Sequence, residues 1–330
     1  MGLLEKLQTV FMLAAIALGF AAGELSPAFG LTAGSFIVPA LTAMLFGLFL
    51  SIPIKDLKAG FLNLKFTIIS LGLNFLWIPI LGWVLGGLFL QDSPALRLGF
   101  LMLLVTPCTD WYLVFTSLAR GNVALSAALL PINLVTQILL LPLYLIIFSG
   151  LTGQLDLQAL FKSIALVLVL PFGLAQAVRY LFHEENPFRS RLEKVFSGGQ
   201  FIFLCLAIMA MFASQADQLK GNLGIFLKLL TPVLLFFFIN FWVGRATAKL
   251  AKMNFADSIS LNLTTLARNS PISLAIAVTA FPDEPLVALA LVIGPLIELP
   301  VLSIISQVLL LMGKSRGAAE MKAEGLSSRL

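Results

Sequence analysis

The stretch LGFLMLLVTPCTDWYLVF, residues 98–115, decides the fold, because it is apolar enough to cross a membrane and yet is interrupted at its middle. The interruption is Thr106-Pro107, followed closely by Cys108 and the charged Asp110. Proline removes a backbone donor and clashes with the preceding turn, so we expect the helix to break or kink here. A hydroxyl residue before proline also favours a helix start, which predicts a second half-helix beginning near Cys108.

A second apolar stretch, residues 259–281, carries the same pattern at Ser270-Pro271, 164 residues after Thr106-Pro107. Pro295 likewise follows Pro131 by 164 residues. We therefore predict a second broken helix. If both helices break, free N–H groups and positive dipole ends converge near mid-membrane, which favours anionic or strongly polar ligands. Two ordinary proline kinks in packed helices are the alternative.

The composition assigns the chain to the membrane. Of its 330 residues, 59% are hydrophobic and 11% are charged, against about 25% charged residues in soluble domains. The single histidine, His183, lies in a charged loop, and no metalloprotease, nucleophile-elbow or phosphate-loop motif appears. We therefore expect a transporter in the lipid bilayer and not an enzyme, with no cofactor and no nucleic-acid partner.

Ten segments reach the length of about 20 mostly apolar residues that a membrane crossing needs. They are residues 7–23, 36–52, 66–90, 98–118, 123–148, 160–182, 195–216, 225–247, 259–281 and 286–312. We predict an all-α integral membrane protein with ten transmembrane helices, of which the fourth and the ninth are broken and cross each other. The first segment can also be read as a signal peptide, but the repeat described next needs it as a helix.

The positive charges sort to one side of these ten helices. Sixteen Lys and Arg residues fall on one side and four on the other, with Arg268 inside a span. By the positive-inside rule, both termini lie in the cytoplasm of a multi-pass protein of the cell membrane. Because five helices per half is an odd number, residues 1–150 and 151–312 are predicted to form two inverted repeats. Residues 313–330 are predicted to be a flexible cytoplasmic tail.

Three ionisable residues fall deep in the predicted spans: Asp110, Arg268 and Glu298. Each costs about 2.5–3.5 kcal/mol at a helix centre, so we expect them to pair, to line a wet cavity, or both. Asp110 and Arg268 either form one structural ion pair or also contact the substrate or a coupling ion. Two acids against one base leave one carboxylate that can bind H⁺ or Na⁺ or stay protonated.

Other polar and soft side chains belong to the same layer. Asn133, Thr136 and Gln137 share one face of the fifth helix, where their oxygens suit Na⁺, although interhelical hydrogen bonds are the alternative. Cys108 directly follows the first break, and a thiol is a soft ligand for metalloids. A lone buried cysteine is more often a small hydrophobic residue, which is how we interpret Cys205.

Five short motifs are shared with a known family. They are Thr106-Pro107-Cys108-Thr109, Pro131-Ile132-Asn133, Ala267-Arg268-Asn269-Ser270, Leu274-Ala275-Ile276-Ala277 and Gly294-Pro295-Leu296-Ile297-Glu298-Leu299-Pro300-Val301. Through them and the ten predicted helices, nearly the whole chain resembles the bile acid:sodium symporter superfamily, which includes the arsenical-resistance efflux permeases. The first and the last motif look most like the arsenical-resistance branch.

The resemblance implies roles for two residues, Cys108 as a thiol ligand of As(III) and Glu298 as the proton-coupling carboxylate. The candidate substrate-binding residues are Cys108, Thr109, Asp110, Arg268, Asn269 and Ser270; the candidate coupling-ion residues are Asp110, Asn133, Gln137 and Glu298. Two features depart from the family pattern. Asp110-Trp111 stands where that branch has small or apolar residues. Arg268 stands where the superfamily has small or amide side chains near its sodium sites, and a guanidinium there argues against sodium coupling and for an anionic substrate.

The sequence therefore predicts a secondary active transporter, most simply a proton-coupled efflux antiporter of arsenite- or antimonite-type metalloid oxyacids. The alternative is Na⁺- or H⁺-coupled transport of an organic anion, either bile-acid-like or a small carboxylate. In that case Arg268 and the two half-helix N-termini would hold the carboxylate. Replacing Cys108 with Ser separates the two hypotheses.

Overall fold

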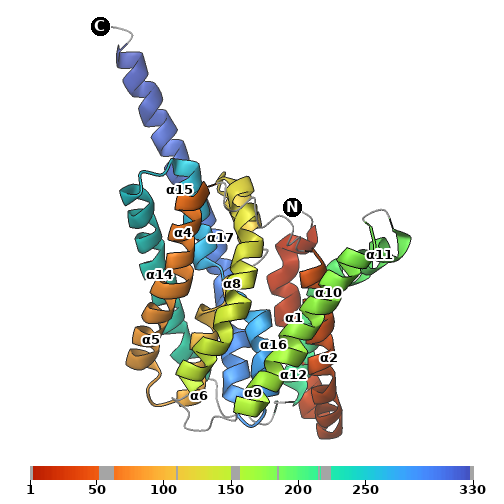
Figure 1. The fold of residues 1–330 in the computed structure, drawn as a ribbon. Coiled ribbons are helices and arrows are strands. Elements are labelled where there is room, and N and C mark those ends of the chain that lie inside the picture. The colour runs from red at the N-terminus through yellow and green to blue at the C-terminus, as the bar shows by residue number, and fades with distance from the viewer. Residues whose placement is uncertain are drawn as a thin grey trace.

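A computed structural model describes residues 3–51, 63–108, 111–149, 157–183, 186–214, 216 and 224–327. Within these ranges the chain is built of helices and contains no β-strand, so the predicted all-α class is confirmed. Figure 1 shows most of the helices running side by side along one direction. They form two groups, whose facing surfaces enclose the site described below.

The first group is centred on α2, which packs against α1, α10 and α12. Its helices are α1 (Leu3–Leu25), α2 (Pro27–Ser51), α9 (Leu157–Ile164), α10 (Leu170–Leu181), α11 (Pro187–Leu192) and α12 (Gln200–Ser214). Gly47 of α2 lies directly against the backbone of Phe196, since an added Cβ would come within 2.2 Å of the Phe196 carbonyl oxygen. Any larger residue would push these two segments apart.

The second group packs α6 against α5, α16 and α17, and packs α14 against α5 and α15. Its helices are α4 (Leu64–Gly72), α5 (Ile78–Phe89), α6 (Pro94–Leu104), α7 (Trp111–Leu118), α8 (Val123–Ser149), α14 (Gly224–Leu250), α15 (Phe255–Leu266), α16 (Ser270–Ala280) and α17 (Pro285–Ser327). At Gly99 of α6, an added Cβ would come within 2.5 Å of the Val287 carbonyl oxygen of α17. The two helices therefore touch at their backbones.

Both predicted helix breaks are confirmed. α6 ends at Leu104 and α7 begins at Trp111, while α15 ends at Leu266 and α16 begins at Ser270. The expected capping residue of the second break is wrong by one position. The side chain of Asn269, and not that of Ser270, accepts the hydrogen bond from the Ile272 N–H, because it stands just before the first helical residue.

Two π-helical turns, η3 (Leu73–Trp77) and η4 (Ala165–Val169), each precede a proline, Pro79 and Pro171. Because proline has no N–H and crowds the preceding turn, the helix widens at these points without ending. Near η3 the Phe75 carbonyl accepts a hydrogen bond from the Tyr144 hydroxyl of α8 at 2.5 Å. Both segments were predicted to be continuous helices.

Several helices are long and apolar enough to cross a membrane. Among the described residues there are six, or seven if the bent pair Pro187–Ser197 and Gln200–Ser214 counts as one span: Ala28–Ser51, Leu64–Phe89, Val123–Phe148, Phe161–Leu181, Leu227–Leu250 and Pro285–Gly313. The protein is therefore a multi-pass membrane protein. The count of ten spans stays a prediction, since broken helices such as α6 and α16 are too short to be counted alone.

The C-terminal part of α17 differs from the expectation of an irregular tail. The helix continues without a break to Ser327 and extends well beyond the other helices in Figure 1. The division of the chain into two five-helix halves and a flexible tail remains a prediction.

Candidate functional site

The two helix breaks lie against each other and are joined by backbone hydrogen bonds. Pro107 and Arg268 form an antiparallel β-bridge. The Cys108 N–H donates to the Ala267 carbonyl at 3.0 Å, and the Asn269 N–H donates to the Thr106 carbonyl at 2.7 Å. The segments 105–108 and 267–269, which we call the crossing, therefore form one unit in which the thiol and an amide side chain are held side by side.

Hydroxyl groups fasten the end of α6 to the start of α16. The Thr106 hydroxyl lies 3.1 Å from the Met102 carbonyl, 3.1 Å from the Asn269 carbonyl and 3.0 Å from the Ser273 hydroxyl. Ser273 in turn donates to the Met102 carbonyl at 2.8 Å. The contacts with Met102 satisfy a carbonyl that the C-terminal end of α6 leaves without an intrahelical partner.

The Arg268 guanidinium is buried, at 3% exposure, and is surrounded by oxygen atoms of the protein. Its Nη1 donates to the Leu104 carbonyl at 2.9 Å, and its Nη2 donates to the Thr265 carbonyl and to Asn74 Oδ1, both at 2.8 Å. The Nε reaches the Leu266 carbonyl at 3.4 Å. Because Leu104 ends α6 and Leu266 ends α15, one cation caps the negative ends of both first half-helices.

Two buried amides complete this shell, and the sequence analysis missed both. Asn74 lies on the π-turn η3, which turns its Oδ1 to Arg268. Asn240 of α14 donates to the Thr265 carbonyl at 2.5 Å and accepts from Trp77 Nε1 at 3.2 Å. An asparagine inside an apolar helix is itself a signal of a polar contact, so these residues could have been found.

Glu298 of α17 contacts the main chain of the crossing. It is 4% exposed, and its Oε1 accepts a hydrogen bond from the Arg268 backbone N–H at 2.7 Å. A charged acceptor makes this bond stronger than one between neutral groups. The strength of this contact therefore depends on whether Glu298 is ionised.

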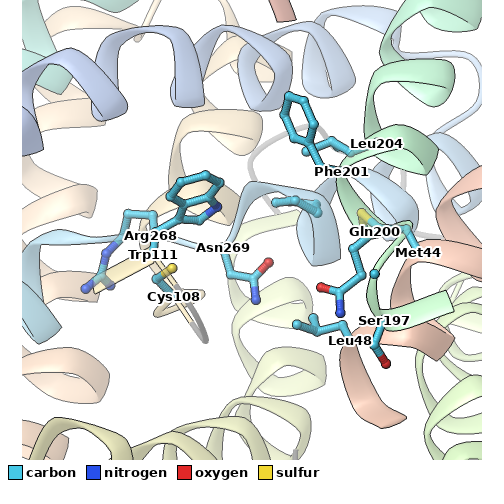
Figure 2. A pocket seen from close by; sticks show the side chains of 12 residues that line it. Met44, Leu48, Cys108, Trp111, Ser197, Gln200, Phe201, Leu204, Arg268 and Asn269 are labelled. Atoms are coloured by element: carbon cyan, nitrogen blue, oxygen red, sulfur yellow. The ribbon is translucent and has the colours of Figure 1, made fainter. Parts of the chain in front are cut away.

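A cavity of about 200 Å³ lies between the crossing and the α2–α12 group. The crossing side contributes Cys108, Trp111, Arg268, Asn269 and Pro271; the opposite side contributes Met44, Leu48, Ser197, Gly198, Gln200, Phe201 and Leu204. Figure 2 shows Asn269 and Gln200 pointing toward each other from opposite walls. The Arg268 guanidinium points away from both, although the residue lines the cavity.

The opposite wall is built on a bend in the chain. The π-turn η5 (Glu193–Ser197) passes through Gly198-Gly199 into α12, and the helices on either side are inclined by 42°. The Ser197 hydroxyl donates to the Gly47 carbonyl at 2.9 Å, and Gln200 Nε2 donates to the Ser51 hydroxyl at 3.1 Å. α2 thus positions both polar groups of this wall.

The structure places the predicted site residues unevenly. Cys108, Arg268 and Asn269 line the cavity, and Glu298 lies behind the crossing, whereas Thr109 and Asp110 fall outside the described residues. Ser270 is buried at the start of α16, and the structure does not place it on the cavity wall. Met44, Ser197 and Gln200 were not predicted as site residues, because nothing local connects them to the breaks. Trp111 directly follows the first break and also lines the cavity.

Asn133 and Gln137 lie elsewhere, on α8. Both are buried, at 0% and 1% exposure, and both ends of each amide have no hydrogen-bond partner among the described residues. A buried polar group without a partner costs about 1–3 kcal/mol, so these amides favour a ligand or an ordered water.

Among the lining residues that the structure describes, permanent charge is scarce. Among the described lining residues Arg268 is the one with a permanent charge, and its guanidinium is occupied by protein carbonyls. No carboxylate is found among those lining residues. The described part of the walls therefore offers a thiol, two amides, a hydroxyl and the Trp111 and Phe201 rings.

Comparison with known proteins gives consistent matches. The model of the Sodium Bile acid symporter family matches residues 38–222. The arsenical-resistance protein Acr3 of Corynebacterium glutamicum is 29% identical over 71% of this chain and 67% of its own length, and that of Alkaliphilus metalliredigens is 23% identical over 91% and 90%. The sodium/bile acid cotransporter 7-A of Xenopus laevis is 23% identical over 73% of this chain and 71% of its own length.

Proposed function

This chain belongs to the Sodium Bile acid symporter family, and from that premise we propose that it expels arsenite- or antimonite-type metalloid oxyacids from the cell in exchange for protons. It is a membrane transporter and not an enzyme. The relatives named arsenical-resistance proteins support this substrate class. The observation that carries the proposal is the small cavity in which a thiol faces neutral hydrogen-bonding groups.

The size of the cavity separates the two substrate classes. Pockets for drug-sized ligands occupy about 300–1,000 Å³. The cavity at the crossing holds about 200 Å³, which is too small for a steroid acid and suits a solute of a few heavy atoms. This argues against a bile-acid-like substrate and leaves a small carboxylate as the rival.

The surroundings of Cys108 favour the metalloid over the small carboxylate. Cys108 is 1% exposed and its backbone N–H donates to the Ala267 carbonyl, so the residue that carries the thiol is held at the crossing and lines the cavity. A soft sulfur ligand suits As(III) and Sb(III). A carboxylate would need a cation, and the Arg268 guanidinium is already bonded to the carbonyls of Leu104 and Thr265.

The same arginine argues for protons as the coupling ion. The oxygens around Arg268 are neutral carbonyl and amide groups of the kind that bind hard cations, and the guanidinium already occupies them. We assign the coupling role to Glu298, whose protonation weakens its bond to the Arg268 N–H and so loosens the crossing. One proton moving inward across 100 mV supplies about 2.3 kcal/mol, roughly a 50-fold gradient of a neutral solute.

Contacts at the helix ends support the predicted sidedness of the ten helices. Asp92 follows the third predicted helix and Lys228 lies at the start of the eighth, so both are on the outer side of the predicted topology. They form an ion pair at 2.7 Å, which holds the pKa of the Asp92 carboxyl below its ordinary value. On the inner side, Lys65 donates to the Ala251 carbonyl. Residues assigned to one side are thus neighbours, and the positive-inside rule then places both termini in the cytoplasm.

The direct test is growth of a metalloid-sensitive strain that expresses the protein. We expect resistance to arsenite and antimonite, loss of that resistance in Cys108→Ser, and full resistance in the matched control Cys205→Ser, whose thiol lies on α12 away from the crossing. Cell-surface protein levels of the variants are measured by immunoblot. Sensitivity equal to that of the empty vector, with the wild-type protein present in the membrane, rejects the metalloid proposal.

A further inference from the structure

A second hollow lies far from the crossing, where α14 ends, and it is strongly basic. It encloses about 660 Å³, and its walls include Trp242, Arg245, Lys249, Lys252, Phe255 and Met312. We call these six residues the basic groove. No carboxylate is found among the described residues that line it. We propose that the basic groove binds the phosphate of an anionic membrane phospholipid.

The position of the groove is that of a lipid headgroup. Two candidate spans, Leu227–Leu250 and Pro285–Gly313, end beside it. A third candidate span, Leu64–Phe89, begins beside it, because Lys65 donates to the Ala251 carbonyl in the turn after α14. The groove therefore lies at the level where the hydrocarbon core gives way to the polar headgroups.

The three cations are spaced to face one ligand. Arg245, Lys249 and Lys252 follow one another at four and three residues, so the first two share one face of α14 and the third follows in the turn. Arg245 is fixed by a hydrogen bond to the Ser258 hydroxyl at 2.9 Å and by the Phe255 ring, 5.2 Å from its guanidinium carbon. Lys249 and Lys252 are exposed, and neither forms an ion pair with any described residue.

The backbone of Lys252 is in the left-handed region. Its φ is 52°, a left-handed conformation that glycine adopts without strain and a lysine does not. The turn is closed by hydrogen bonds from the Lys252 N–H to the Lys249 carbonyl and from the Met253 N–H to the Ala248 carbonyl, both 3.0 Å.

Apolar side chains beside the cations favour a lipid over a free anion. Trp242 is 54% exposed and Leu250 is 84% exposed, so the outer face of α14 is suited to acyl chains. Phe255 and Met312 extend the apolar wall of the groove itself. A soluble phosphate would gain from the cations but not from this surface.

The experiment measures the melting temperature of the purified full-length protein in a neutral detergent. Phosphatidylglycerol is titrated against phosphatidylcholine, and inorganic phosphate is a third arm. The test variants are the double variant Lys249→Gln/Lys252→Gln and the single variant Lys252→Gly. The matched control is Arg191→Gln/Lys194→Gln, which removes two exposed cations from α11 and η5.

We expect phosphatidylglycerol to raise the melting temperature of the wild type and of the control by several degrees more than phosphatidylcholine does. The double variant should lose at least half of that difference. Lys252→Gly should melt at or above the wild-type temperature without lipid, since the turn is relieved of strain, and yet respond less to phosphatidylglycerol. An equal response in all variants overturns the proposal, and so does a full response to inorganic phosphate alone.

Discussion

Replacement of Arg268 by Ala tests how the crossing is held together. The change removes three hydrogen bonds of 2.8–2.9 Å, to the Leu104 carbonyl, the Thr265 carbonyl and Asn74 Oδ1. Bonds from a charged donor are worth about 1.5–3 kcal/mol each, and removing the buried charge returns about 2.5–3.5 kcal/mol. The net loss is about 4 kcal/mol, which corresponds to a fall of about 8 °C in melting temperature.

The assay is thermal unfolding of the purified protein in detergent, with Arg97→Ala as the matched control. Arg97 stacks on Trp83 at 4.7 Å, and its buried Nε has no hydrogen-bond partner among the described residues. Removing Arg97 Nε therefore leaves no carbonyl without its hydrogen-bond donor. We expect a smaller fall in melting temperature than for Arg268→Ala. If the melting temperature fell equally in the two variants, the hydrogen bonds between Arg268 and the surrounding oxygens would not contribute to stability beyond the loss of any buried arginine.

The same variant tests whether the guanidinium replaces a bound cation. The wild-type protein should melt at one temperature in sodium, potassium and choline salts of equal ionic strength. Arg268→Ala should regain part of its stability in sodium or in low millimolar guanidinium, because either cation can reach the vacated carbonyls. Sodium-specific stabilisation of the wild type would refute the reasoning, as would a variant that no cation rescues.

Three further predictions concern the cavity, the coupling residue and the outer surface. Gln200→Ala should raise the KM for arsenite several-fold in everted vesicles and leave the melting temperature nearly unchanged, since only one bond, to Ser51, is lost. Glu298→Gln keeps an acceptor for the Arg268 N–H, so the protein should fold but lose acceleration by an imposed pH gradient, measured as arsenite flux. Asp92→Asn should lower the melting temperature slightly at neutral pH and low salt only. Because the pKa of Asp92 is lowered, its ion pair with Lys228 stabilises the protein fully at pH values above the ordinary carboxylate pKa. This stabilisation is lost as the pH falls through the lowered pKa, so wild type and variant should have the same melting temperature at low pH.

The two helix breaks could be predicted from the sequence, because the prolines of Thr106-Pro107 and Ser270-Pro271 disrupt the helical turn in which they lie. The carbonyl partners of Arg268 could not be predicted, because every residue has a carbonyl and these are brought together only when α6 and α15 meet. The side-chain partner Asn74 was predictable in principle, since an asparagine inside an apolar helix signals a polar contact. For the same reason the capping role went to Asn269: the Thr106 carbonyl fixes the Asn269 N–H and with it the position of the side chain.

The residues of the cavity wall opposite the crossing could not be predicted for a different reason. Gln200 and Met44 lie in apolar helices whose sequence resembles that of any lipid-facing segment, and they face the crossing only because Gly47 lets α2 approach Phe196 closely. Their role follows from packing between two groups of helices, which neither composition nor spacing encodes.

A cavity whose two walls belong to separate helix groups also gives a way to stop the transporter. A compound that forms hydrogen bonds with Asn269 and Gln200 at once would hold the two helix groups together and prevent them from moving apart. A longer and more rigid compound would inhibit more strongly. The transported substrate, in contrast, must be small enough to dissociate from one wall before the other.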